Sequence, residues 1–207
     1  MLKYYSKHFP SVEINYTFNR LPSEKVLADW QRETPPNFKF TLKAPRRITH
    51  ARDLDDRGML EAFLPCAHLL GGHLGVLLFQ FPPTFKIDKL NVFDELLKRL
   101  PASEDIRAAF EFRHASWFEE RVYGLLKARN FALCVAESDE LVTPRVATAG
   151  YGYLRLRKEK YGPKAMREIA AWIQGREWND VFIYFKHEDT GTGPKFCKRL
   201  MKELAQS

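Results

Sequence analysis

Residues 107–117 read RAAFEFRHASW, a segment in which an apolar strand runs into a group of polar side chains. Side chains alternate along a strand, so Glu111 and Arg113 share one face. Phe110 and Phe112 share the other. A carboxylate and a guanidinium at the end of a buried strand are costly to desolvate unless they are paired. They form either a structural ion pair at the end of the strand or part of a ligand site. Polar residues at the ends of the other strands would favour the ligand site.

Strand and helix patterns alternate on both sides of this segment. The expected strands are residues 11–18, 38–43, 74–81, 108–113, 131–136, 149–157 and 181–186. The expected helices are residues 1–9, 24–33, 55–70, 88–100, 119–129, 163–173 and 194–204. Residues 74–81 (LGVLLFQF) are almost all apolar, which is typical of a strand covered on both faces. This order predicts an α/β fold built on a parallel sheet.

Two parallel layouts fit this alternation, an open doubly wound sheet and a closed barrel. A dinucleotide-binding sheet should carry GxGxxG after its first strand, and the sequence has no such motif there. We therefore expect a TIM-type barrel of about seven strands and seven helices. It forms a single domain of residues 1–207. Such a barrel ordinarily begins with a strand, whereas this chain begins with a helix, so the first strand is expected to be lacking.

The composition is that of a soluble globular protein, with 45% hydrophobic and 29% charged residues. A net charge of +7 favours anionic partners, but Lys and Arg are spread along the chain and form no basic arm typical of nucleic-acid binders. Three isolated cysteines indicate a reducing compartment, and no apolar run reaches the roughly 18 residues of a membrane span. We therefore expect a cytoplasmic protein without membrane contact. No HExxH, HxH or paired-Cys spacing is present, so neither a metal nor another cofactor is predicted.

Polar side chains follow apolar positions at the end of nearly every expected strand. In a parallel barrel these ends meet at one face, where they would form a polar mouth suited to a ligand. The alternative for each residue is a local partner, such as a neighbouring charge for Glu13 or the backbone for Gln80. The candidates are Glu13, Asn15, Thr17, Lys43, His50, Gln80, Glu111, Arg113, Glu137, Arg155, Arg157, Lys186 and His187.

A glycine-containing turn precedes the last expected helix. Residues 186–194 read KHEDTGTGP, and a turn of this kind exposes backbone N–H groups at a helix start, which suits an anion. Thr192 and Gly193 are therefore added to the predicted substrate-binding residues. An ordinary connecting loop explains the same letters equally well.

Six ordered motifs resemble the YecE-like family, a domain of unknown function (number seventy-two). They are EINYTF (13–18), FKFTLKAPRRITH (38–50), LGVLLFQFPPTF (74–85), EFRHASW (111–117), YLRLR (153–157) and YFKHEDTGTGP (184–194). The resemblance spans the chain and implies a TIM-type barrel related in shape to the endonuclease IV and xylose isomerase superfamily, with no established activity. Its recurrent positions match Glu13, Asn15, Thr17, Lys43, His50, Gln80, Glu111, Arg113, Ser116 and Trp117.

The chain departs from this family pattern in two places. The Gly-rich first strand and loop with which family members usually begin are expected to be lacking ahead of the first helix. Arg157 and Lys158 stand where many members carry a His-Gly pair, so no role of that histidine carries over. The metal ligands of the superfamily have no counterparts here that can be aligned.

Three functions remain open from the sequence. The first is an enzyme, a hydrolase or isomerase, acting on a phosphorylated or other anionic ligand. In it Glu13 or Glu111 is the acid or base, Lys43 offsets developing charge and His50 or His187 transfers a proton. Asn15, Thr17, Gln80, Arg113, Arg155, Lys186, His187, Thr192 and Gly193 would bind the substrate. The second is a nucleic-acid-binding module without catalysis. The third is a barrel that has lost activity. The residues leave the oligomeric state open.

Overall fold

The computed structural model describes residues 1–54, 58–101, 106–138, 140–185 and 191–205. The chain divides into two compact units, Met1–His114 and Ala115–Ser207, and each is described by itself. Helices and parallel strands alternate in both, so the predicted α/β class is confirmed. The strands of the described ranges form separate parallel sheets, and no closed barrel is found among them.

Unit 1 contains a parallel sheet with the strand order β1-β2-β3-β4. Its strands are β1 (Ser11–Ile14), β2 (Lys39–Lys43), β3 (Leu74–Gln80) and β4 (Ala108–Glu111). Its α-helices are α1 (Leu2–Tyr5), α2 (Glu24–Glu33), α3 (Arg46–Thr49), α4 (Met59–His68) and α5 (Leu90–Arg99). Short 3-10 helices are η1 (Tyr16–Phe18), η3 (Gly71–His73) and η4 (Ile87–Lys89).

Local sequence signals explain the bounds of α2, which are those predicted. The Ser23 hydroxyl caps the helix by accepting a hydrogen bond from the Val26 N–H at 3.4 Å. Thr34 and the prolines after it end the helix, because proline removes a backbone donor and restricts the residue before it.

The predicted alternation around β4 is confirmed by an aromatic cluster on one of its faces. The Phe93 ring of α5 is fully buried and lies edge-on to the rings of Phe110 and Phe112, with centroid distances of 5.4 and 5.3 Å. Phe81 stacks on Phe112 at 5.5 Å. With its apolar partners on one side, the strand presents Glu111 on the other.

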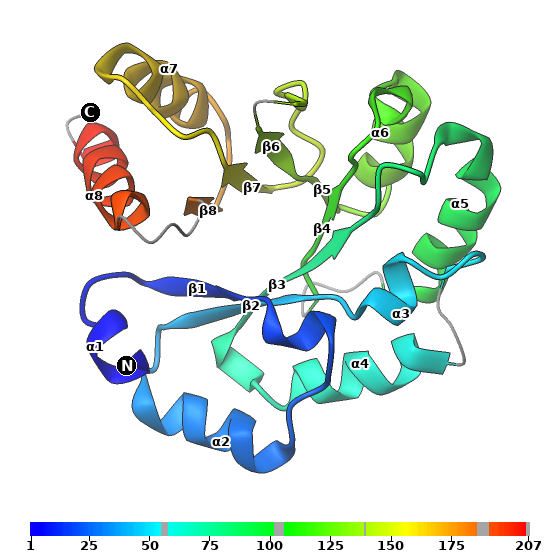
Figure 1. Cartoon of the computed structure of the whole chain (residues 1–207), viewed down its shortest axis with the longest axis horizontal. Coiled ribbons are helices and arrows are strands. Elements are labelled where there is room, and N and C mark those ends of the chain that lie inside the picture. Colours follow the sequence, from blue (N-terminus) through cyan, green and yellow to red (C-terminus); the bar gives the residue numbers. More distant parts are fainter. Residues whose placement is uncertain (55–57, 102–105, 139, 186–190, 206–207) are drawn as a thin grey trace. The chain divides into compact units, whose positions relative to one another are not determined.

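The helix predicted over residues 1–9 is shortened to α1 (Leu2–Tyr5), and two other predicted segments of unit 1 differ in the type of element. Residues 16–18 form η1 instead of extending the first strand. The Thr17 hydroxyl donates to the carbonyls of Lys43 and Ile14, at 2.6 and 3.2 Å, and so turns the chain onto the end of β2. Residues 44–52, predicted as a loop, contain α3, which directly follows β2 (Figure 1). The predicted helix start at residues 55–57 lies outside the described residues.

Unit 2 contains the parallel sheet β6-β7-β8. The strands of unit 2 are β5 (Ala132–Leu133), which is not part of this sheet, β6 (Val135–Glu137), β7 (Tyr151–Leu156) and β8 (Asp180–Phe185). Its helices are η5 (Ala115–Trp117), α6 (Glu120–Lys127), α7 (Pro163–Gln174) and α8 (Thr192–Ala205). The strand predicted at 131–136 is divided into β5 and β6. A core that includes Leu154, Met166, Ile169 and Leu200 packs α7 and α8 against this sheet.

None of the helices in the described ranges combines the length and the apolar character needed to cross a bilayer.

Candidate functional site

The carboxyl ends of the unit 1 strands bring several of the predicted residues together. Parallel pairing sets Lys43 opposite Leu78, and two residues further along β3 it sets Gln80 opposite Glu111. We call the polar side chains at this edge the strand-end cluster, and its members are Lys43, Arg46, His50, Gln80, Glu111 and Arg113.

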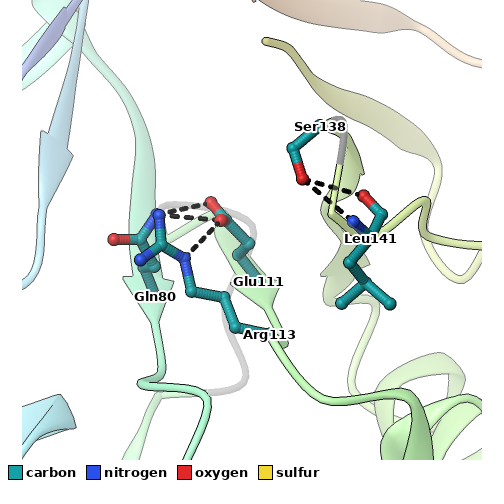
Figure 2. Close-up of polar contacts among 5 residues, drawn as sticks. All are labelled: Gln80, Glu111, Arg113, Ser138 and Leu141. Atoms are coloured by element: carbon teal, nitrogen blue, oxygen red, sulfur yellow. Dashed lines mark hydrogen bonds and ion pairs between the residues drawn. The ribbon is translucent and has the colours of Figure 1, made fainter. Parts of the chain in front are cut away.

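A buried carboxylate lies at one side of the strand-end cluster. Glu111 is 2% exposed, and the Gln80 side-chain amide donates to both of its oxygens at 2.8 Å (Figure 2). The Arg113 Nε lies 3.4 Å from Glu111 Oε1, and the Arg113 side chain is 40% exposed. The predicted pair of Glu111 and Arg113 is therefore present, but it is joined by a buried amide that holds the carboxylate in one orientation.

An aromatic ring joins the other members of the cluster. The Lys43 ammonium lies 3.9 Å from the centroid of the Phe18 ring, within the range of a cation–π interaction. The imidazole of His50 meets the same ring edge-on at 5.2 Å. The Thr49 hydroxyl lies 2.9 Å from His50 Nδ1. Nε2 is then the ring nitrogen that would meet a ligand or exchange a proton.

The charge around His50 is positive. Partial burial of the ring and the charges of Lys43, Arg46 and Arg113 lower the pKa of His50 from its ordinary value of 6.5. The three cations come from β2, from α3 and from the segment after β4. Arg113 acts both on His50 and on Glu111, so the two sides of the cluster are electrostatically connected. An imidazole kept neutral among cations can accept a proton when an anion enters.

The residues predicted around β1 are placed beside this cluster by their backbone contacts. Glu13 pairs in register with Thr41, and the Asn15 side-chain amide donates to Glu13 Oε1 at 3.3 Å. Thr17 is fully buried, with its hydroxyl bonded to the carbonyl of Lys43. Thr17 thus fixes the loop that carries Phe18. The substrate-binding roles of Asn15 and Thr17 remain predictions.

The remaining predicted site residues belong to unit 2 or lie outside the described residues. Arg155 is buried on β7, opposite Ala136 and Tyr184 on its neighbours. Thr192 and Gly193 open α8, and Gly193 is buried. Lys186 and His187 fall outside the residues that the structure describes. A single mouth shared by all candidates therefore remains a prediction.

Unit 2 contains an ion cluster of its own, at the end of β6. Glu137 is 5% exposed and lies 3.0 Å from Arg145 Nη2 and 3.4 Å from Lys158 Nζ. The Ser138 hydroxyl closes the following turn through two 3.1 Å hydrogen bonds with the backbone of Leu141 (Figure 2). Glu137 was singled out by its place at a strand end. Arg145 was not, because it stands in a loop without any periodic pattern.

Sequence reasoning also missed the part played by Phe18. An aromatic residue in an expected strand is ordinarily interpreted as core, and only its packing shows that its ring contacts both Lys43 and His50. Within the described ranges no group of three His, Cys, Asp or Glu side chains is arranged to hold a metal ion.

We expect the His50 imidazole to titrate below pH 6.5 in the free protein, because burial and three cations oppose its protonation. Folded His50 then binds its proton less readily than the unfolded chain does. Its contribution to stability is therefore lost as the pH falls through 6.5, and the His50→Asn variant should lose less stability than the wild type on acidification. A pH titration of the imidazole signals by NMR measures the pKa of His50. Lys43→Met should move the His50 pKa upward, whereas Lys98→Met on α5 should leave it unchanged; equal effects of the two would contradict the assignment.

The comparisons with known proteins concern the whole chain. The family model described as "Protein of unknown function DUF72" matches residues 1–207. UPF0759 protein YunF of Bacillus subtilis (strain 168) is 33% identical over an alignment of 203 residues, covering 90% of this chain and 70% of that protein. UPF0759 protein YecE of Escherichia coli (strain K12) is 32% identical over 120 residues, covering 56% of this chain and 43% of that protein.

Two solved structures share the fold. A DUF72 family protein from Thermotoga maritima MSB8 has a TM-score of 0.84 at 24% identity, with 99% of this chain and 88% of that chain covered. A DUF72 family protein from Enterococcus faecalis V583 has a TM-score of 0.76 at 19% identity, with 100% and 94% covered. The resemblance to the YecE-like family is thus confirmed. This chain belongs to the DUF72 family of proteins of unknown function.

Proposed function

We propose that this protein binds a small phosphorylated or otherwise anionic ligand at the strand-end cluster of unit 1. The observation that carries the proposal is that Lys43 and His50 both contact the ring of Phe18, while the charges of Lys43, Arg46 and Arg113 all act on His50. Cationic donors that converge from separate elements are the usual means of holding a phosphate or carboxylate group.

The balance of charge within the cluster supports an anion. Glu111 is already engaged by Gln80 and Arg113. Lys43 rests on the face of Phe18, which shields one side of its ammonium from water. Three cations stand against one carboxylate in the strand-end cluster. An arriving anion would therefore be attracted and would relieve the repulsion among the cations.

The same arrangement suits acid–base chemistry on the bound ligand. A neutral His50 beside the anion could accept or return a proton, and Lys43 would offset charge that develops on an oxygen. Glu111 on β4, or Glu13 on β1, is the carboxylate proposed as the general acid or base. Both hydrolysis and isomerisation fit these roles. Binding is the part of the proposal that can be tested first.

We also propose that residues 1–207 form a single TIM-type barrel domain. Each unit contributes parallel strand pairs, and helices follow the strands in both, as the repeating unit of such a barrel requires.

We expect Lys43→Ala and Arg113→Ala each to weaken the binding of inorganic phosphate or glycerol phosphate by about tenfold, since a hydrogen bond to a charged group contributes about 1.5–3 kcal/mol. Isothermal titration calorimetry of the intact chain measures this.

Lys98→Ala is the matched control, because Lys98 lies on α5 and pairs with Asp94 and Glu95 on its own helix. It should leave phosphate affinity unchanged. Absence of saturable phosphate binding, or an equal loss in the Lys98 variant, would refute the proposal.

A further inference from the structure

An exposed tyrosine lies in η1, the same turn as Phe18, whose ring contacts Lys43 and His50. η1 follows β1, and its three residues differ sharply in exposure. Thr17 is buried and bonded to the carbonyl of Lys43, and Phe18 lies under the Lys43 ammonium. Tyr16, the first residue of the same turn, is 43% exposed.

The ring of Tyr16 is held in place by a neighbouring cation. Arg20 Nε donates to the Tyr16 hydroxyl at 2.5 Å, and the guanidinium carbon lies 5.3 Å from the ring centroid. These contacts restrict a side chain that would otherwise rotate freely at the surface. An aromatic ring fixed in an exposed position, with an arginine against it, is a surface on which a planar group can stack.

The short distance along η1 connects this ring to the cations. Consecutive Cα atoms are about 3.8 Å apart, so the Cα atoms of Tyr16 and Phe18 are separated by at most about 7.6 Å. The ring of Phe18 is in contact with both Lys43 and His50. A single ligand in which one sugar joins an anionic group to a flat ring would span this separation.

We propose that the anion at the strand-end cluster is the phosphate of a ligand that also carries a planar aromatic ring, as in a nucleoside monophosphate, and that this ring stacks on Tyr16. This inference rests on the proposed anion-binding function and specifies the class of ligand. The phosphate meets Lys43, Arg46 and Arg113, and the ring meets the exposed face of Tyr16. Tyr16 thus provides the specificity for the ring, and the three cations, which are different residues, attract the phosphate.

Other exposed apolar residues do not offer the same combination. Tyr4 on α1 is 71% exposed, and its ring contacts His8 at 4.7 Å. Val142 and Met201 are exposed in unit 2 and have no aromatic face to offer. Scattered surface apolar residues of this kind are common in soluble proteins. Tyr16 differs because it shares its turn with the residue on which Lys43 rests.

The test uses three probes on the intact chain: adenosine 5′-monophosphate, ribose 5-phosphate and adenosine. Calorimetric titration should show the monophosphate binding about tenfold or more tightly than ribose 5-phosphate, and adenosine more weakly than the monophosphate. Tyr16→Ala should remove the advantage of the monophosphate while leaving ribose 5-phosphate unchanged. Tyr16→Phe should retain most of the advantage, because it keeps the ring. Tyr4→Ala is the matched control for removing an exposed tyrosine.

The outcomes separate this inference from the function on which it rests. If both phosphates bind equally in the wild type, or if Tyr16→Ala weakens both to the same extent, the stacking inference is wrong and anion binding stands. If neither phosphate binds, the proposed function itself fails. Adenosine binding as tightly as its monophosphate would also overturn the inference, since the ring would then act without the cations.

Discussion

Replacing Gln80 with leucine should lower the free energy of unfolding by about 3 kcal/mol. Gln80 donates to both oxygens of Glu111, and both side chains are almost fully buried. Leucine cannot donate, so the variant leaves part of a buried carboxylate without its hydrogen bonds. That cost lies at the upper end of the range for a buried unsatisfied group, because the group is charged. Urea denaturation followed by circular dichroism measures the change.

Gln31→Leu provides the matched control. The Gln31 side chain also donates two hydrogen bonds, to the carbonyls of Leu69 and Leu70 at 3.2 and 3.0 Å, but its acceptors are neutral and the residue is only half-buried. We expect a loss of about 1 kcal/mol there, the usual net contribution of a hydrogen bond. If Gln80→Leu costs no more than Gln31→Leu, Glu111 does not depend on Gln80 for its place.

Arg113 cannot replace Gln80 in this role. Its Nε lies 3.4 Å from Glu111, at the long end for a hydrogen bond, and the side chain is 40% exposed, so solvent screens the pair. The buried amide is therefore the main local partner described for the carboxylate.

Replacing Gly152 with alanine should destabilise the protein by about 1–3 kcal/mol, the usual cost of an overpacked core. A Cβ at Gly152 on β7 would lie 2.5 and 2.8 Å from Cε3 and Cη2 of the Trp178 indole, and closer still to Cζ3. The indole cannot move away at little cost. Its Nε1 donates to the Ala149 carbonyl at 3.1 Å, and its ring packs edge-on against Trp172 at 5.1 Å. Thermal unfolding followed by tryptophan fluorescence reports both the stability and the ring.

Gly124→Ala, in the exposed interior of α6, should act in the opposite direction. A Cβ there meets nothing within 4 Å, and alanine restricts the unfolded chain, so a gain of about 0.5–1 kcal/mol is expected. A loss of stability at both glycines would point to a general effect of the substitution. A neutral Gly152→Ala variant would show that the indole repacks without cost.

Much of the local structure could be predicted because its causes are local. The serine cap and the prolines set the limits of α2, and the apolar run at residues 74–81 gave β3 its place at the centre of the sheet. Glu111 and Gln80 could each be predicted to end a strand of a parallel sheet, where register brings such ends to one edge.

Other features depend on contacts between residues far apart in the chain. Residues 16–18 continue a good strand pattern, yet the bond from Thr17 to the carbonyl of Lys43, 26 residues away, bends them into η1. That bend exposes Tyr16 and places Phe18 under a cation, and neither position follows from alternation. Similarly, Arg145 reaches Glu137 from a loop whose course the sequence pattern does not specify.

The sequence by itself determined the α/β class, the parallel strands, the family and the set of polar residues at the strand ends, because periodicity, caps and motif order are written in neighbouring residues. Tertiary structure alone decided which of those residues meet. Hydrogen bonds such as Thr17 to Lys43 and Gln80 to Glu111 close segments of 26 and 31 residues. Such bonds form only once a sheet has aligned its strands, so the cationic surroundings of His50 and the exposed ring of Tyr16 belong to the fold.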